Sequence, residues 1–223
     1  MVILITGASK GVGLEVTKQL CQNNNIIAIS RSDILFSHQN LIGIKGDIND
    51  NKTIEKCWQT IHQNFSKLDV IINNAGVLIN KPFENIRQEE LQTIYSTNVF
   101  APFNLIQKML PLLKKSENAH IVNITSMGGV TGTQKFAGLS AYSSSKGALS
   151  ILTECLAEEL LNFNIKCNAL ALGAVQTEML SNAFPDYKAP ISAKEIAEFI
   201  AWFSLNGQKF FNGKILPVAL STP

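Results

Sequence analysis

The sequence predicts an α/β protein built on a doubly wound parallel sheet of about seven strands with helices on both faces. Short apolar runs alternate along the chain with longer segments of helical periodicity. The apolar runs are continuous, as in parallel strands buried on both faces, and do not alternate with polar residues. No linker, repeat or low-complexity stretch interrupts the pattern, so residues 1–223 are expected to form one domain.

The strands and helices follow from these patterns. Strands are expected at Val2–Thr6, Ile26–Ser30, Leu41–Lys45, Val70–Asn73, His120–Thr125, Ile165–Leu172 and Lys214–Ala219. Helices are expected after Gly13, at Asn51–Phe65, over Arg87–Lys115 as one helix or two with breaks at Pro102 and Pro111, at Tyr142–Phe163 with near-total burial, and at Ile196–Leu205. A capping-box signature, Ser192 with Glu195, precedes the last of these helices.

Composition excludes several classes of function. Hydrophobic residues make up 46% of the chain, which is incompatible with intrinsic disorder. The net charge of +2 and the lack of a basic run predict no nucleic-acid partner, and no apolar stretch is long enough to predict a membrane span. The four cysteines form no Cys-x-x-Cys pair and there are only three histidines, so no metal site is expected. With no signal peptide evident at the start, a cytoplasmic protein with reduced cysteines is expected.

The charged fraction is low. Charged residues make up 16% of the chain, against about 25% in typical soluble domains. This favours a sheet covered on both faces, a surface hidden by oligomerisation, or both.

A glycine-rich segment follows the first expected strand and opens a helix. Its residues are candidates for binding a dinucleotide: Gly7, Ser9, Lys10, Gly11, Val12 and Gly13. Glycines allow a tight turn and let the backbone approach a pyrophosphate, which the helix N-terminus also attracts. A flexible turn is the alternative, but the position between strand and helix favours the nucleotide site.

The end of the second expected strand predicts NADP(H) in preference to NAD(H). Arg31 stands where a residue reads the adenosine ribose, and its guanidinium can bind a 2′-phosphate. Lys10 would add a second positive charge. Asp33 is an opposing signal, since an acid at this place favours NAD.

The motifs together resemble those of the short-chain dehydrogenases/reductases, which consist of one Rossmann domain. The resemblance covers essentially the whole chain and rests on the glycine segment, on Asn73-Asn-Ala-Gly76, on Asn98, on Ser126 and on Tyr142 with Lys146. It implies that the backbone at Asn74, Ala75 and Gly76 lines the cofactor. It also places Asp47 and Ile48 beside the adenine and Thr177 on the nicotinamide or phosphate side, and it makes Gly173 and Val175 cofactor-binding residues. Asp47 could equally be a helix cap or a turn residue.

The catalytic candidates are Asn98, Ser126, Tyr142 and Lys146. Tyr142 and Lys146 are one helical turn apart and share a face, so the ammonium is expected to lower the pKa of the phenol. Tyr142 would then be the general acid/base, and Lys146 would also bind the nicotinamide ribose, as the resemblance implies. Ser126 would orient the substrate oxygen, with Thr125 as a rival. The resemblance implies that Asn98 holds a water linked to Lys146.

Some spacings depart from the family. Leu172 precedes Gly173 where proline is usual, which predicts a more mobile loop. Thr131–Gly138 is an addition between Ser126 and Tyr142 that should border the substrate pocket. The stretch between Arg31 and Asp47 is too short for the usual helix, and a short segment before Ile191 predicts a small lid. A small lid hints at a bulky substrate or one tethered to a carrier.

These observations predict an NADP(H)-dependent carbonyl reductase or alcohol dehydrogenase acting on a small-molecule carbonyl or alcohol. The alternative is a non-catalytic nucleotide sensor on the same fold, and a structural scaffold is a third. The resemblance also implies a homodimer or homotetramer. Its contacts would involve the helices around Ala101–Lys115 and Ser143–Leu161, whose apolar stretches would account for part of the low charge.

Overall fold

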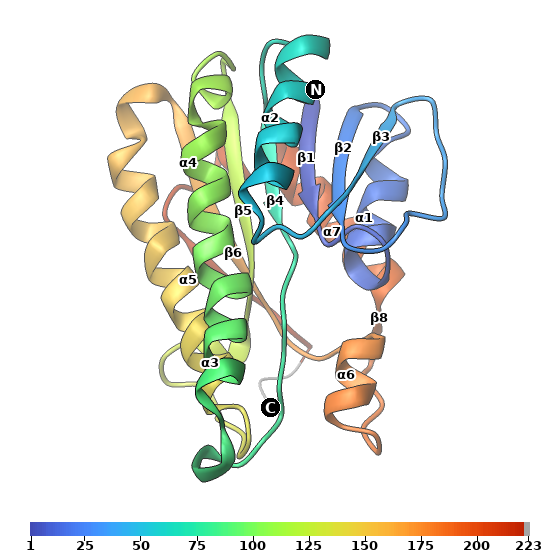
Figure 1. The fold of residues 1–223 in the computed structure, drawn as a ribbon. Coiled ribbons are helices and arrows are strands. Elements are labelled where there is room, and N and C mark those ends of the chain that lie inside the picture. Colours follow the sequence, from blue (N-terminus) through green and yellow to red (C-terminus); the bar gives the residue numbers. More distant parts are fainter. Residues whose placement is uncertain (221–223) are drawn as a thin grey trace.

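The structure, a computed structural model that describes residues 1–220, is organised around one seven-stranded sheet (Figure 1). The strand order is β3-β2-β1-β4-β5-β6-β9, and every neighbouring pair is parallel. The strands are β1 (Val2–Thr6), β2 (Asn25–Ser30), β3 (Leu41–Lys45), β4 (Val70–Asn73), β5 (Ala119–Ser126), β6 (Ile165–Leu172) and β9 (Ile215–Val218). The expected doubly wound fold is therefore confirmed, with strand boundaries within two residues of the predicted ones.

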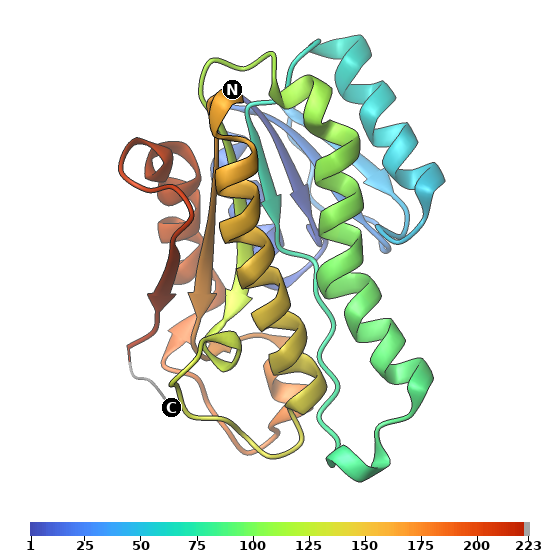
Figure 2. The ribbon, with the colours of Figure 1, turned by 90° about the vertical axis from the view of Figure 1, so that its left-hand side faces the viewer.

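Helices cover both faces of this sheet. One face carries α2 (Asn51–Asn64), α4 (Ala101–Leu113) and α5 (Ser140–Glu159), and the other carries α1 (Gly11–Leu20) and α7 (Ala193–Asn206). Figure 2 shows α4 and α5 running side by side along their face. Because alternate residues of each strand point to opposite faces, the sheet separates two apolar cores. Each strand is thus buried on both sides, as its continuous apolar run predicts.

The expected Arg87–Lys115 helix is three consecutive helical segments. The segments are α3 (Gln88–Tyr95), a π-helical turn (Ser96–Phe100) and α4. Pro102 lies in the first turn of α4, where a missing N–H is tolerated. The predicted break at Pro111 is wrong, because α4 continues through it to Leu113.

The helix expected at Tyr142–Phe163 begins earlier and ends earlier, at Ser140 and Glu159. Its predicted near-total burial is wrong. Only one side packs on the sheet, while Ile151 is 60% exposed on the opposite side. The capping box predicted before α7 is present, with the Ser192 hydroxyl accepting from the Glu195 N–H and the Glu195 carboxylate accepting from the Ser192 N–H.

Two connections shape the site. The segment between β2 and β3 contains no helix, as its length predicts. After β6 the chain forms β7 (Val175–Gln176), α6 (Glu178–Ala183) and β8 (Ile191–Ser192), and β7 pairs with β8. The sequence predicts a small lid here but gives no signal for β7, α6 and β8. Figure 1 places α6 below the carboxyl ends of the strands.

Within residues 1–220, no helix combines the length and apolarity that a membrane span requires. The same residues contain no group of three or more His, Cys, Asp and Glu side chains placed to hold a metal ion.

Candidate functional site

A cavity of about 730 Å³ opens at the carboxyl ends of the strands. It lies at the switch point of the sheet, where the chain moves outward from β1 to β2 on one side and to β4 on the other. All seventeen predicted cofactor-binding residues line it: Gly7, Ser9, Lys10, Gly11, Val12, Gly13, Arg31, Asp47, Ile48, Asn74, Ala75, Gly76, Tyr142, Lys146, Gly173, Val175 and Thr177.

The glycine loop is held rigidly against the loop after β4. Thr6 Oγ1 accepts hydrogen bonds from the N–H groups of Asn74 and Ala75, at 3.1 and 3.0 Å, and the Asn74 side chain donates to the Thr6 carbonyl at 2.9 Å. A Cβ on Gly13 would lie 2.2 Å from the Gly7 carbonyl oxygen, so only glycine fits there. The loop and the N-terminus of α1 therefore form a cradle for a phosphate group.

The charges at the adenosine end fall into two groups. Arg31 lines the cavity, and no ion-pair partner for it is found among residues 1–220. Asp33 pairs instead with Lys45, at 2.9 Å, and does not line the cavity. Lys10 pairs with Glu178 of α6 at 2.7 Å, which offsets the second positive charge that the sequence suggested.

Asp47 is a turn residue that also lines the cavity. Its carboxylate accepts from the Asn49 N–H at 2.9 Å, whereas Asp50 caps α2. The interpretation of Asp47 as a helix cap is therefore wrong, and the turn interpretation is right.

Three of the four catalytic candidates meet in this cavity. Tyr142 and Lys146 come from the first turns of α5, and Ser126 ends β5. The Ser126 side chain lies close enough to the Tyr142 phenol to act on its pKa, despite the inserted segment between these residues. The rival Thr125 also lines the cavity and is buried with its hydroxyl unpaired, but the side chain that lowers the pKa of Tyr142 is that of Ser126.

The pKa values of Tyr142 and Lys146 are both shifted by burial. Burial raises the pKa of Tyr142 above that of an ordinary phenol, and the neighbouring Ser126 hydroxyl offsets this only in part. Burial also lowers the pKa of Lys146 to about 8. The Lys146 ammonium donates to the Ile124 carbonyl at 2.8 Å, so it is directed partly away from the phenol. The expectation of a lowered Tyr142 pKa is thus wrong, because burial outweighs the effect of the neighbouring side chains.

Asn98, the fourth candidate, lies outside the cavity lining, in the π-helical turn. Its amide group accepts from the Val77 N–H at 2.8 Å and donates to the Val77 carbonyl at 3.0 Å and to Ser145 Oγ at 2.9 Å. Asn98 therefore joins the loop after β4 to α5. Ser145 is fully buried, and no sequence signal distinguishes it from the serines beside it.

Two walls enclose the far end of the cavity. One is the inserted segment, from which Thr133, Gln134 and Phe136 line the cavity, as predicted for Thr131–Gly138. The other is α6 and the residues after it. Thr177 caps this helix by accepting from the Leu180 N–H at 3.3 Å, so it supports the wall as well as lining the cavity.

The two walls are tied to one short segment, Asn80–Lys81. The Lys81 N–H donates to the Gly138 carbonyl at 2.9 Å, and the Asn80 side chain donates to the Ala183 carbonyl at 2.8 Å. This segment is itself held by Glu90 of α3. These contacts join residues far apart in the chain, so no local sequence pattern predicts them.

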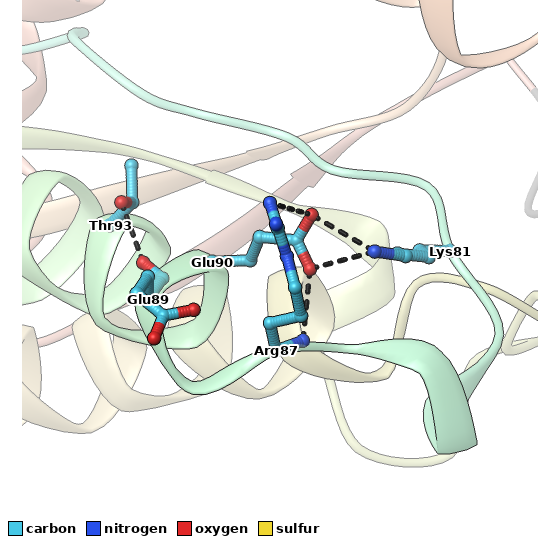
Figure 3. Close-up of polar contacts among 5 residues, drawn as sticks. All are labelled: Lys81, Arg87, Glu89, Glu90 and Thr93. Atoms are coloured by element: carbon cyan, nitrogen blue, oxygen red, sulfur yellow. Dashed lines mark hydrogen bonds and ion pairs between the residues drawn. The ribbon is translucent and has the colours of Figure 1, made fainter.

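Figure 3 shows how Glu90 is held. Its carboxylate accepts from Lys81 Nζ at 3.0 Å to both oxygens, from the Arg87 N–H at 2.9 Å and from the Arg87 guanidinium at 3.2 Å. These donors lower the pKa of Glu90 to about 2, with the Arg87 N–H as the largest cause. The charge is therefore present throughout the neutral range.

The fold and this cavity define a nucleotide-binding oxidoreductase architecture. Residues 1–188 match the family described as short chain dehydrogenase. The chain therefore belongs to the short-chain dehydrogenase/reductase family, whose members are hydride-transferring oxidoreductases that use a nicotinamide cofactor. This confirms the resemblance drawn from the motifs.

Individual relatives are distant. The chain is 29% identical to a 3-oxoacyl-[acyl-carrier-protein] reductase of Thermotoga maritima, over 88% of this chain and 80% of that protein. It resembles the ligand-free aldohexose dehydrogenase of Thermoplasma acidophilum with a TM-score of 0.88 and 22% identity, over 100% of this chain and 96% of that chain. The structure of ElxO with NADP bound gives a TM-score of 0.86 and 25% identity, over 98% and 96% of the two chains.

The residues present fit a nicotinamide dinucleotide. The cradle at Gly7 and Gly13 suits a pyrophosphate, and Thr177 lies beside it, since a Cβ on Gly11 would be 3.7 Å from the Thr177 methyl group. Arg31 and Asp47 follow β2 and β3 on one side of this cradle, and Tyr142 follows β5 on the other. A Cβ at Gly76 would lie 3.4 Å from both the Lys146 ammonium and the Asn98 side-chain oxygen, so the loop after β4 passes close to Lys146.

Proposed function

We propose that the protein is an NADP(H)-dependent carbonyl reductase or alcohol dehydrogenase, with residues 1–223 acting as one cofactor-binding and catalytic domain. The observation that carries the proposal is the meeting of Ser126, Tyr142 and Lys146 in the cavity that the glycine loop also lines. A nicotinamide bound there would supply or accept the hydride. The choice of NADP(H) rests on Arg31, which faces the cavity while Asp33 is paired with Lys45.

Each side chain has a distinct task in the proposed mechanism. Ser126 donates a hydrogen bond to the substrate oxygen and holds it beside the Tyr142 hydroxyl. Tyr142 donates its proton to this oxygen during reduction and removes it during oxidation. Lys146 binds the nicotinamide ribose and supplies positive charge near the phenol, which favours the phenolate after proton transfer.

Asn98 has a supporting task in this proposal. Its side chain is fully used by Val77 and Ser145, so any water linked to Lys146 would be held by the backbone of the π-helical turn. The side chain then fixes the position of this turn relative to α5. π-Helical turns are frequent at functional sites, which is consistent with this role.

The test is turnover of NADPH with a panel of ketones, aldehydes and 3-oxoacyl thioesters, followed by nicotinamide absorbance. Tyr142→Phe should reduce kcat/KM by about 100- to 10 000-fold while leaving NADPH affinity within a few-fold. Tyr95→Phe is the matched control, because Tyr95 bonds to Ser144 Oγ at 3.0 Å and does not line the cavity. Undiminished turnover in Tyr142→Phe would refute the mechanism, and tight NADPH binding without turnover of any carbonyl would favour the nucleotide sensor.

A further inference from the structure

We propose that the substrate of this site is an uncharged carbonyl compound, or the corresponding alcohol, whose carbonyl carbon carries an apolar aromatic or branched aliphatic group. The inference rests on the proposed function and adds the substrate class. Selection would occur in the chamber between the inserted segment Thr131–Gly138 and the α6 segment, beyond Tyr142.

Both chamber walls present large apolar side chains to the cavity. The large side chains that line them are Phe136, Leu139, Met179, Leu180, Phe184 and Tyr187. The rings of Phe136 and Phe184 meet edge to face with centroids 6.4 Å apart, so the two walls touch across the cavity. A flat or branched apolar group would therefore contact side chains from both walls at once.

The exposure of these side chains indicates that they bind a ligand. Phe136 is 37% exposed, Met179 43% and Tyr187 48%. Such apolar surface, gathered around one cleft, is uncommon unless something covers it. A bound apolar group would bury it and gain the associated hydrophobic free energy.

The charges available in the cavity exclude an ionic substrate group. Over the described residues 1–220, the ionisable Lys, Arg, Asp and Glu side chains that line it are Lys10, Arg31, Asp47, Lys146 and Glu178. Lys10 and Glu178 neutralise each other at 2.7 Å. Arg31 and Asp47 lie at the adenosine end, and Lys146 donates to the Ile124 carbonyl near the phenol. A carboxylate, phosphate or ammonium in the chamber would lose its water without gaining a counter-charge.

A substrate with many hydroxyl groups fits no better. The Thr133 hydroxyl is already bonded to the carbonyls of Met127 and Val130, at 2.6 and 2.9 Å. In the other wall, the Thr177 oxygen accepts from the Leu180 N–H and Glu178 pairs with Lys10. Gln134 and the Tyr187 hydroxyl are thus the polar side chains of the two walls that could pair with substrate hydroxyls without sharing an existing partner. Sugars are thus expected to be poor substrates, because their hydroxyls would be buried without partners.

The experiment compares 4-isopropylacetophenone with 4-acetylbenzoate, two aryl methyl ketones of the same heavy-atom count whose para substituent is either a branched apolar group or a carboxylate. With NADPH, kcat/KM should be at least ~100-fold higher for the isopropyl compound. An aldohexose should be a poorer substrate than either. Equal rates for the two ketones, or a preference for the carboxylate or the sugar, would overturn the proposal.

A variant adds a charge to the chamber. Leu180→Arg should raise the acetylbenzoate rate relative to the isopropyl rate by at least ~10-fold. Leu161→Arg is the matched control, since Leu161 is 47% exposed and lies outside the cavity lining. This variant should leave the ratio of the two ketone rates unchanged. An unchanged ratio in Leu180→Arg with intact NADPH binding would count against the chamber as the selecting element.

Binding separates failure of this inference from failure of the proposed function. Calorimetry on the NADPH complex measures both ketones without requiring reaction. Preferential binding of the isopropyl ketone without turnover would support the chamber and refute the reaction. Turnover without preference would support the reaction and refute the chamber.

Discussion

The Lys146 ammonium lies 5.9 Å from the ring centroid of Tyr142, close enough to act on the phenol and yet buried enough to lose part of its own proton affinity. Burial shifts the two groups toward neutrality from opposite sides. The pKa of Lys146 falls to about 8, while that of Tyr142 rises. The pair therefore carries less charge near neutral pH than two exposed side chains would.

Lys146 should destabilise the fold at neutral pH. Below pH 8 its buried ammonium is charged in both folded and unfolded protein, and the burial cost is fully present. Between pH 8 and about 10.4 only the unfolded chain keeps the proton, so stability rises with pH through this window. Lys146→Met should thus raise the free energy of unfolding at pH 7 by about 2 kcal/mol, after loss of one hydrogen bond, and this gain should vanish above the window.

Denaturant unfolding of the cofactor-free protein at pH 7 and pH 10.5 measures this difference. Lys56→Met, at an exposed position of α2, serves as the control and should show no pH-dependent gain. If Lys146→Met is less stable than the parent protein at pH 7, the burial argument is incorrect.

The two reaction directions should respond differently to pH. Reduction needs the protonated phenol, and the raised pKa of Tyr142 keeps it protonated across the neutral range. Oxidation needs the phenolate, which becomes available only as pH rises. We expect reduction rates with saturating NADPH to be nearly flat from pH 6 to about 8, and alcohol oxidation to increase steadily with pH. Faster oxidation at pH 6 than at pH 9 would contradict this assignment.

Arg31 should determine the preference for NADPH. A charge-assisted contact with a 2′-phosphate contributes roughly 1.5–3 kcal/mol, so Arg31→Ala should raise the NADPH Kd by about 10- to 150-fold and leave the NADH Kd nearly unchanged. Asp33→Ala tests the opposing signal. Because Asp33 pairs with Lys45 outside the cavity lining, its removal should leave NADH affinity unaltered. Fluorescence titration of both cofactors measures these constants, and a parent protein without NADPH preference would overturn the argument.

Glu90 should act on substrate binding from outside the cavity lining. Glu90→Gln weakens its hold on Lys81, and the two chamber walls tied to Asn80–Lys81 should loosen. We expect KM for the carbonyl substrate to rise by about 10-fold, with kcat and the NADPH Kd nearly constant. Glu55→Gln removes a comparable ion pair with Lys108, between α2 and α4, and should change none of these quantities. Equal effects of the two variants would indicate general destabilisation instead.

Much of the site could be predicted from local sequence. Glycines at positions 7 and 13, between a buried strand and a helix, are typical of a dinucleotide-binding turn. Tyr142 and Lys146 are four residues apart and therefore share one face of an α-helix. The continuous apolar runs also determine which strands are buried on both sides. These features depend on residues near one another in the chain.

The remaining features depend on contacts between distant segments. Nothing near Glu90 in the sequence indicates that Lys81 and Arg87 would share its carboxylate. The raised pKa of Tyr142 follows from burial by the whole cavity, whereas the sequence shows only the nearby lysine. The unbroken helix at Pro111 likewise reflects tertiary packing of α4, whose buried residues include Met109 and Leu113.

The paired helices α4 and α5 should form a contact between copies of the chain. Phe103 of α4 is 47% exposed and Ile151 of α5 is 60% exposed, on the helical layer that Figure 2 faces. Covering such side chains would also account for part of the low surface charge.

We expect the protein to elute as a dimer or tetramer, and Ile151→Glu to shift it toward the monomer because the new carboxylate would be buried without a partner. Leu35→Glu, at a position that is 97% exposed between β2 and β3, is the control and should leave the assembly intact. Light scattering during size-exclusion chromatography measures the mass. A parent protein that is monomeric at micromolar concentration would refute this interface, and an assembly broken by Trp202→Glu but not by Ile151→Glu would move it to α7, where Phe199 and Trp202 are also exposed.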